Sequence, residues 1–182
     1  ESLNIEILSA EVRPVWARIE NLKKPTIAAI DGPCSAGGLV LAMCCDFRVA
    51  AETARIADLH IKNMGVIGGD APGIRLARLL GPAKAKEIMF LGEFLDGKEA
   101  YRIGLANRCF PSSKLMEGAR DIARKIAGMR AAAISLGKDS INATTGMAYE
   151  QALAYTYKCN ALLDTTEGAR AFTEKRAPKF ED

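Results

Sequence analysis

Hydrophobic residues recur at helix or strand spacing along almost the whole chain. Between residues 5 and 22 they fall three or four positions apart, which predicts an amphipathic helix. The apolar, β-branched run over residues 26–30 predicts a buried strand, and an apolar helix is expected over residues 36–44 after a glycine turn. Short strands are predicted over residues 47–51 and 55–57. This alternation of helices and strands favours an α/β layer fold.

Glycine and proline punctuate the middle of the chain. Residues 65–73 hold four glycines and one proline, which predicts a turn-rich loop. Asp96 precedes Glu99 by three residues, which is the spacing of a helix N-cap with a capping box. Helices are also predicted over residues 74–80 and 83–91, and a last short strand over residues 105–110.

Only helical periodicity follows Pro111. Helices are predicted over residues 113–129, 131–143, 147–164 and 166–175. The change of pattern predicts a strand-containing domain over residues 1–111 and an all-helical domain over residues 112–182.

Composition limits the functions that the chain can have. The 182 residues carry a formal net charge of +3 with scattered basic residues, so we expect no nucleic-acid partner. All apolar stretches are shorter than the roughly 18 residues that span a membrane, and the first residues lack a secretory signal, so we expect a cytoplasmic protein without a membrane partner. The five cysteines, an odd number without paired spacing, indicate a reducing compartment with neither disulfides nor a metal site.

The stretch GPCSAGGLVLAMCCD, residues 32–46, places a glycine pair between the buried strand and the apolar helix. One interpretation of Gly37 and Gly38 is a tight turn where another segment passes close to the backbone. The other is an anion site, because the first N–H groups of a helix lack internal acceptors and lie at the positive end of its dipole. Neither a dinucleotide fingerprint nor a P-loop is matched. An oxyanion hole, which stabilises an oxygen that becomes negative during a reaction, is the better functional interpretation.

Three segments carry a resemblance to a known family. They read KPTIAAIDGPCSAGGLVLAMCCDFRVAAETARIA, GPAKAKEIMFLGEFLDGKEAYRIGLANRCFP and AFTEKRAPKF. From about residue 14 to its end, the chain resembles the enoyl-CoA hydratase/isomerase family, the crotonase superfamily. The resemblance implies a spiral core of repeated ββα turns, incomplete at its N-terminus, followed by an all-helical C-terminal oligomerisation domain.

The resemblance also implies an acyl-CoA thioester as ligand, with coenzyme A as part of the substrate and no separate cofactor. In this family two backbone N–H groups polarise the thioester carbonyl, and the second of them corresponds to Gly37. The first comes from a segment that in relatives precedes the position of Glu1. We therefore expect either a fragment or cleaved product, or an unseen segment that supplies this donor.

The catalytic carboxylates of the family are replaced in this chain. Hydratases carry one glutamate three residues after the oxyanion glycine, where this chain has Val40. Their second glutamate corresponds to His60, and the spacing from His60 to Gly65 is one residue longer than usual. Adding water to a conjugated C=C bond needs one group that delivers hydroxide and another that protonates carbon, and valine can do neither. The sequence therefore argues against hydration by two glutamates.

His60 is the only histidine of the chain. The ordinary pKa of a histidine, about 6.5, suits proton transfer at neutral pH. Asp58 is expected to orient His60, because residues two apart in a strand point the same way; a purely structural histidine is the alternative. Asp70 is a second candidate for moving a proton, and a cap for the helix over residues 74–80 is its alternative. Arg75 is expected on a solvated helix face.

Further contacts follow from the resemblance. Around Gly37, substrate-binding positions are implied at Ser35, Gly38, Val40 and Leu59. Phe172 and Lys175 match positions that approach the CoA nucleotide of a neighbouring subunit, and a lysine suits a phosphate group. A solvated cation at a helix end is the alternative for Lys175. We expect a homotrimer or hexamer.

The resemblance and the residues together predict an acyl-CoA enzyme that acts through an enolate stabilised by an oxyanion hole. Hydration is the activity of the family's hydratases. With a single base, double-bond isomerisation, decarboxylation or thioester hydrolysis is easier to support. A catalytically reduced subunit that binds CoA esters or serves only in assembly is the alternative outside enzyme function.

Overall fold

The structure is a computed structural model, and it describes residues 15–180. The chain divides into two compact units, which are described separately. The first contains the described residues up to Leu22 together with Thr26–Ile122. The second contains Lys23–Pro25 and the described residues from Ala123 onward.

Parallel strands form the centre of the first unit. Strands β1 (Ile27–Ile30), β3 (Phe47–Ala51) and β5 (Arg108–Phe110) make one sheet in the order β1-β3-β5. Strands β2 (Pro33–Ser35) and β4 (Arg55–Ala57) pair separately, also in parallel. The chain therefore runs through two consecutive strands and a helix, then repeats this order, and equivalent strands of the two repeats pair with each other.

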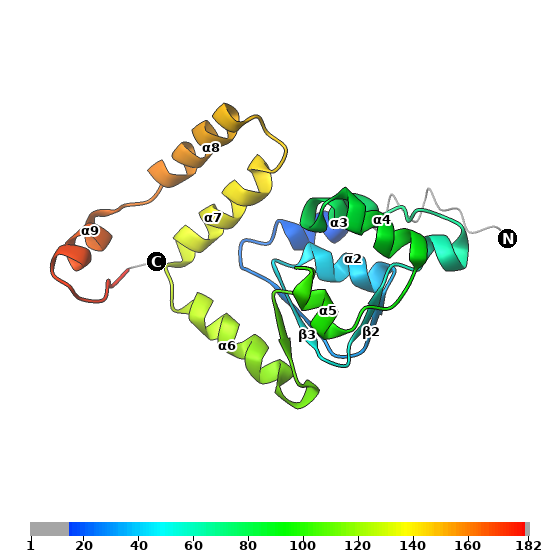
Figure 1. Ribbon diagram of the computed structural model, residues 1–182. Coiled ribbons are helices and arrows are strands. Elements are labelled where there is room, and N and C mark those ends of the chain that lie inside the picture. The colour runs from blue at the N-terminus through cyan, green and yellow to red at the C-terminus, as the bar shows by residue number, and fades with distance from the viewer. Residues whose placement is uncertain (1–14, 181–182) are drawn as a thin grey trace. The chain divides into compact units, whose positions relative to one another are not determined.

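Helix α2 (Gly37–Cys44) lies between β2 and helix α3 (Pro72–Leu80), as Figure 1 shows. Its side chains are apolar on nearly every face, and Leu39, Val40, Ala42, Met43 and Cys44 are buried. Helix α4 (Pro82–Leu91) packs along α3. These helices and β4 bury the main hydrophobic core, so the chain on either side of α2 is held on a rigid base.

The predicted N-cap of helix α5 (Gly97–Arg102) is confirmed. The Asp96 carboxylate accepts the N–H of Glu99 at 2.7 Å. In a full capping box the Glu99 side chain would also accept the Asp96 main-chain N–H. Here the Glu99 carboxylate instead accepts from the Arg102 guanidinium one turn later.

Several boundaries differ from the sequence prediction. Strand β2 lies within the predicted glycine turn, because its partner β4 is remote in the sequence. The last strand covers only Arg108–Phe110 of the predicted 105–110. Residues 15–20 are helical, and the earlier part of the helix predicted over residues 5–22 lies outside the described residues.

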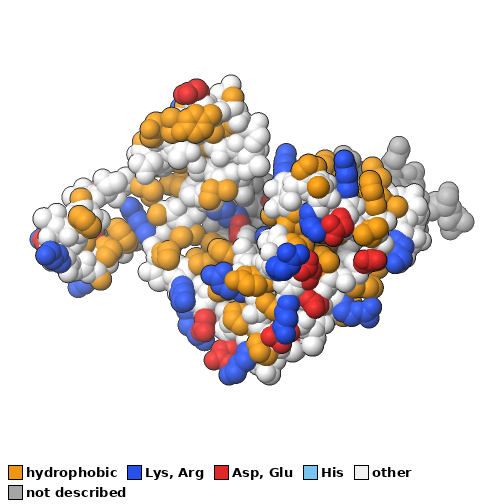
Figure 2. Space-filling model, in the orientation of Figure 1, with side chains coloured by type: hydrophobic (Ala, Val, Ile, Leu, Met, Phe, Trp, Pro, Cys, Tyr) orange, Lys and Arg blue, Asp and Glu red, His pale blue; other side chains and the backbone are white. Residues whose placement is uncertain are grey.

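The described part of the second unit is helical. After a 3-10 turn, η2 (Ser112–Lys114), helix α6 (Leu115–Ala127) runs from the first unit into the second. Helices α7 (Ala131–Thr144) and α8 (Tyr149–Ala161) pack together, and Tyr155 donates to Asp139 between them at 2.7 Å. Helix α8 presents exposed hydrophobic side chains, among them Tyr149 and Tyr157 (Figure 2). Helix α9 (Thr166–Thr173) is tied to the following residues by a bidentate pair between Glu167 and Arg176.

Candidate functional site

The carboxyl ends of β2 and β4 bring two sequence-distant segments together. In the register of this parallel pair Ser35 lies opposite Ala57. Helix α2 begins two residues after Ser35, and the segment 58–60 directly follows Ala57. The glycine turn and the histidine therefore lie at the same edge of the pair. In open α/β sheets, ligands bind at the carboxyl ends of the strands.

Gly37 is the first residue of α2 and presents an unused backbone donor. The N-cap is Ala36, which has left-handed φ (48°) and makes no side-chain cap bond. The first α-helical bond of the turn is donated by Val40 to the Ala36 carbonyl at 3.1 Å. Within residues 15–180 no acceptor is recorded for the Gly37 N–H. This N–H lies at the positive end of the helix dipole.

The space next to this turn is open. Among residues 15–180, a Cβ atom placed on Gly37 or on Gly38 would meet no atom within 4 Å. The interpretation that another segment passes close to these glycines is therefore wrong. A ligand can occupy the space that packing leaves free, and Gly38 is exposed while Gly37 is half-buried.

His60 is paired with Asp58, as the sequence suggested. Its Nδ1 lies 3.1 Å from Oδ2 of Asp58, and its main-chain N–H donates to Oδ1 of Asp58 at 3.0 Å. Asp58 is fully buried and His60 is 8% exposed. The pair does not arise from strand geometry, because β4 ends at Ala57 and the two residues lie in the turn that follows.

A turn of π-helix, η1 (His60–Met64), begins at the histidine. The N–H of Gly65 bonds back to the carbonyls of His60 and Ile61, and Gly65 takes left-handed φ (66°). Lys62 donates from this turn to the Gly92 carbonyl at the end of α4, at 3.1 Å. A π-turn holds one more residue than an α-turn, which accounts for the extra residue between His60 and Gly65.

The glycine-rich loop closes against the histidine ring through Gly68. Gly68 has left-handed φ (79°), and a Cβ there would lie 3.1 Å from Cε1 of His60 and 3.0 Å from the Pro72 ring. The sequence predicted the loop, but which of its glycines contacts the ring follows only from the tertiary structure.

Asp70 does not cap a helix, so that interpretation is wrong. Helix α3 begins at Pro72, earlier than the predicted residue 74, and its N-cap is Ala71 without a side-chain cap bond. The half-buried Asp70 accepts through its main-chain carbonyl from Nε of Arg75 at 3.5 Å. Within the described part of the chain, no contact between the carboxylate of Asp70 and His60 is recorded.

Arg75 is half-buried and paired, rather than fully solvated as expected. It forms an ion pair with Glu20 of the helix that covers residues 15–20. Partial burial lowers the pKa of Arg75, but its hydrogen bond to Glu20 and the charges of Cys44, Glu20 and Asp70 together outweigh this, so the pKa is raised overall. Arg75 therefore ties the loop carbonyl of Asp70 to this helix as a permanent cation.

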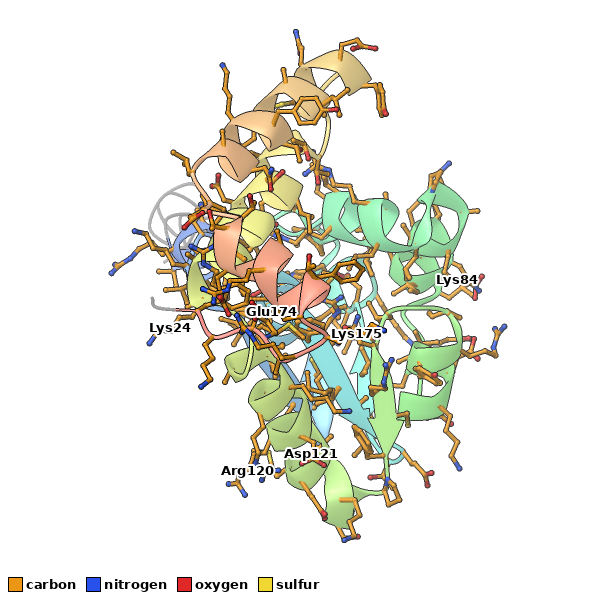
Figure 3. The ribbon with its side chains drawn as sticks, turned by 90° about the vertical axis from the view of Figure 1, so that its left-hand side faces the viewer. Lys24, Lys84, Arg120, Asp121, Glu174 and Lys175 are labelled. Carbon is orange, nitrogen blue, oxygen red and sulfur yellow. The ribbon has the colours of Figure 1, made fainter. Side chains whose placement is uncertain are left out.

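The remaining predicted site residues differ in their surroundings. Val40 is fully buried in the main core, and no carboxylate stands at its position. Ser35 and Leu59 are half-buried beside the turn and the histidine. Phe172, which is 87% exposed, and Lys175 belong to the second unit, and Lys175 follows the end of α9 with left-handed φ (Figure 3).

The described residues lack the features of a metal site and of a membrane span. Among residues 15–180, no group of three or more His, Cys, Asp and Glu side chains could hold a metal ion. No helix in the same range is long and apolar enough to cross a bilayer.

Comparisons with known proteins show which proteins the chain is similar to. A family model described as enoyl-CoA hydratase/isomerase matches residues 4–182. A Mycobacterium bovis protein named "Probable enoyl-CoA hydratase echA8" is 36% identical over 181 residues, which are 96% of this chain and 69% of that protein. Crotonyl-CoA hydratase of Syntrophomonas wolfei is 35% identical over 170 residues, which are 91% of this chain and 65% of that protein.

The fold is also that of crystallised relatives. The crystal structure of an enoyl-CoA hydratase from Bacillus anthracis matches with a TM-score of 0.88 and 33% identity, over 98% of this chain and 72% of that one. The sequence match and the structural match to these relatives both cover nearly the whole chain. The chain therefore belongs to the enoyl-CoA hydratase/isomerase family of the crotonase superfamily.

Proposed function

We propose that this chain binds an acyl-CoA thioester and stabilises an enolate formed from it. The observation that carries the proposal is the juxtaposition at the ends of β2 and β4: the Gly37 N–H, which has no recorded acceptor among residues 15–180, and the Asp58-paired His60 lie at the same edge of the strand pair. The names of the similar enoyl-CoA hydratases support the same ligand class.

The N–H of Gly37 donates to the thioester carbonyl oxygen. Charge accumulates on this oxygen as a proton leaves the neighbouring carbon, so a donor fixed beforehand lowers the barrier. Loss of one such donor typically costs about 3 kcal/mol. A second donor, as in the relatives, completes the hole.

His60 moves the proton, since one nitrogen of a neutral imidazole can accept a proton and return it. Asp70 is the less supported candidate, because its main-chain carbonyl accepts from Arg75 and the charge of its carboxylate also acts on Arg75. Ser35, Gly38 and Leu59 are proposed to surround the acyl group, and CoA is part of the substrate. Val40, expected at the same site, is fully buried in the core and is not proposed to contact it.

Two reactions start from the same enolate chemistry. Hydration is what the relatives are named for. Double-bond isomerisation is the second candidate, and the buried Val40 favours it, because one base can take a proton from Cγ and return it to Cα without a second acid. Decarboxylation and thioester hydrolysis by one base stay open, as does a CoA-ester-binding assembly subunit.

The quaternary arrangement is proposed from the family resemblance. A homotrimer or hexamer would bring Phe172 and Lys175 of one subunit to the CoA nucleotide of the next. Partners other than acyl-CoA and further copies of the chain are not proposed, and a cytoplasmic location stays a prediction.

Calorimetric titration with crotonyl-CoA, a short conjugated thioester, tests the proposal. Gly37→Ala should fold normally, since its methyl group meets no atom within 4 Å, but that methyl occupies the space which the carbonyl would enter. We expect binding weakened by about tenfold or more and turnover lowered about a hundredfold. Gly32→Ala is the matched control, because its methyl group also meets no atom within 4 Å and it lies before β2 rather than after it.

Mass spectrometry of the product separates the reactions, since hydration adds one water and isomerisation leaves the mass unchanged. A wild-type chain without CoA-ester affinity would favour the assembly subunit. Unchanged turnover in His60→Ala would remove the histidine from the mechanism.

A further inference from the structure

We propose that Asp58 is a positioning residue that holds His60 in its Nδ1–H tautomer, leaving Nε2 as the proton-accepting atom. The role of Nε2 in turnover rests on the proposed function. The tautomer itself does not, because it follows from the contacts of the two side chains.

The Asp58 carboxylate binds both the backbone and the ring of the residue two positions later. Oδ1 accepts the His60 main-chain N–H at 3.0 Å, and Oδ2 lies 3.1 Å from Nδ1. An ionised carboxylate can only accept hydrogen bonds, so Nδ1 must carry the proton in this pair. In a neutral imidazole the other nitrogen is then an acceptor.

Because Asp58 is buried, water cannot easily replace His60 as its hydrogen-bond donor. Asp58 is 0% exposed, and within the described range no other hydrogen bond to its carboxylate is recorded. A buried carboxylate without a donor is strongly disfavoured. Asp58 and His60 therefore depend on each other, and loss of the carboxylate changes the state of the ring.

The ring is also confined on another side. Its Cε1, the atom between the two nitrogens, lies 3.1 Å from the position of a Cβ on Gly68. A half-turn of the ring about its Cβ–Cγ bond would put Cδ2 in the place of Nδ1 and break the contact with Asp58. The His60 carbonyl is fixed as well, since it accepts from Gly65 and from Val66 in the π-turn.

The sequence offers a direct spectroscopic test, because His60 is the only histidine. The full chain, labelled with ¹⁵N-histidine and purified without a histidine tag, gives one imidazole in a long-range ¹H–¹⁵N correlation spectrum. In the neutral form of the ring, reached by raising the pH until its resonances no longer change, we expect the pattern of a protonated Nδ1 and an unprotonated Nε2. An Nε2–H pattern in the wild-type chain would overturn the proposal without any variant.

Asp58→Asn should invert the tautomer. The amide oxygen keeps the bond from the His60 main-chain N–H, and the amide NH₂ then donates to Nδ1, which moves the ring proton to Nε2. Asp46→Asn is the matched control, since the Asp46 carboxylate likewise accepts a main-chain N–H and a side-chain donor, both from Thr26. It should leave the histidine resonances unchanged. An unchanged tautomer in folded Asp58→Asn would contradict the proposal.

A second pair of variants tests the confinement. Gly68→Ala should shift the histidine resonances, whereas Gly81→Ala should leave them unchanged, because the two glycines have nearly the same left-handed φ (79° and 80°) but only a Cβ on Gly68 would meet the ring. Equal effects of the two variants would show that the loop does not confine His60.

Turnover separates this proposal from the proposed function. Asp58→Asn should lower kcat about a hundredfold or more with little change in KM, because Nε2 then carries the ring proton and cannot accept one from the substrate. If the Nδ1–H tautomer is found and yet His60→Ala turns over normally, Asp58 still positions the ring but the histidine is not the base.

Discussion

Burial sets the chemistry of single side chains in the first unit. Cys34 and Cys44 lie in the main core, and burial raises the pKa of each thiol to about 11. All five cysteines are free, and Cys34, Cys44 and Cys159 are buried. Both core thiols therefore stay protonated in the folded chain well above neutral pH, and we assign them to packing rather than chemistry.

These thiols predict a loss of stability in alkali. Well below pH 9, the pKa of an unperturbed thiol, the two thiols are protonated in both the folded and the unfolded chain and contribute no pH dependence. Between pH 9 and about 11 the unfolded chain loses these protons while the folded chain keeps them, so the free energy of unfolding falls. Urea unfolding over a series of pH values measures the slope. The Cys34→Ala/Cys44→Ala variant should show a shallower fall, and an unchanged slope would contradict the assignment.

The contact between Asp58 and His60 was predicted from the sequence, but for the wrong structural reason. The spacing of Asp58 and His60 suggested that one orients the other, and their contact is present. The suggested reason, a shared strand face, was wrong, because a turn after β4 makes the contact. For Asp70 the sequence suggested either a base or a helix cap. The cap is excluded, because helix α3 begins at Pro72 with Ala71 as its N-cap.

At the scale of elements, local patterns predicted helices well. The helix expected over residues 131–143 is α7, Ala131–Thr144, and the one expected over residues 166–175 is α9, Thr166–Thr173. Two elements were missed: β2 and the π-turn η1. Both depend on contacts across the fold, β2 on its pairing with β4 and η1 on Lys62 reaching the end of α4.

Two helix glycines with opposite surroundings give an element-scale prediction. A Cβ on Gly118 of α6 would lie 2.5 Å from Cζ of Phe110, whereas one on Gly137 of α7 would meet nothing within 4 Å. Alanine is the better helix former, so Gly137→Ala should raise the free energy of unfolding by about 0.5–1 kcal/mol. Gly118→Ala should lower it by about 1–3 kcal/mol, because the Phe110 ring must move.

Denaturant unfolding monitored by circular dichroism measures both variants. The same helix propensity applies at the two sites, so each variant is the control for the other. Equal shifts of the same sign would show that propensity, rather than the contact with Phe110, decides the outcome at Gly118.

At the scale of the whole molecule, a buried arginine ties the parts of the first unit together. Arg48 of β3 is 5% exposed, donates from Nε to the Leu105 carbonyl at 2.7 Å and from Nη1 to the Cys45 carbonyl at 2.8 Å. Its main-chain N–H also donates to the side chain of Asn107 at 2.8 Å. Arg48 therefore joins the end of α2 to the segment that leads into β5.

Arg48→Met should destabilise the first unit by about 2–5 kcal/mol, since the carbonyls of Leu105 and Cys45 lose their donors. Hydrogen exchange of the β3 and β5 amides is the suitable measurement, because a chain of two units need not unfold in one step. Arg55→Met is the control: Arg55 is exposed and lies 4.2 Å from the Phe94 ring, so its loss should cost less than about 1 kcal/mol. If both variants raise the hydrogen-exchange rates of the β3 and β5 amides to a similar extent, Arg48 does not hold these strands together as proposed.

The sequence by itself determined the helices, the α/β alternation, the family and the candidate residues Gly37 and His60. These depend on spacing between near neighbours in the chain or on motifs read in order. Only the tertiary structure decided that the Gly37 turn and the Asp58–His60 pair share one edge of the β2–β4 pair, that Gly68 lies against the ring, and that Val40 is core. Strand pairing of β2 with β4 creates these relations, and periodicity within one segment carries no information about which distant segment becomes its partner.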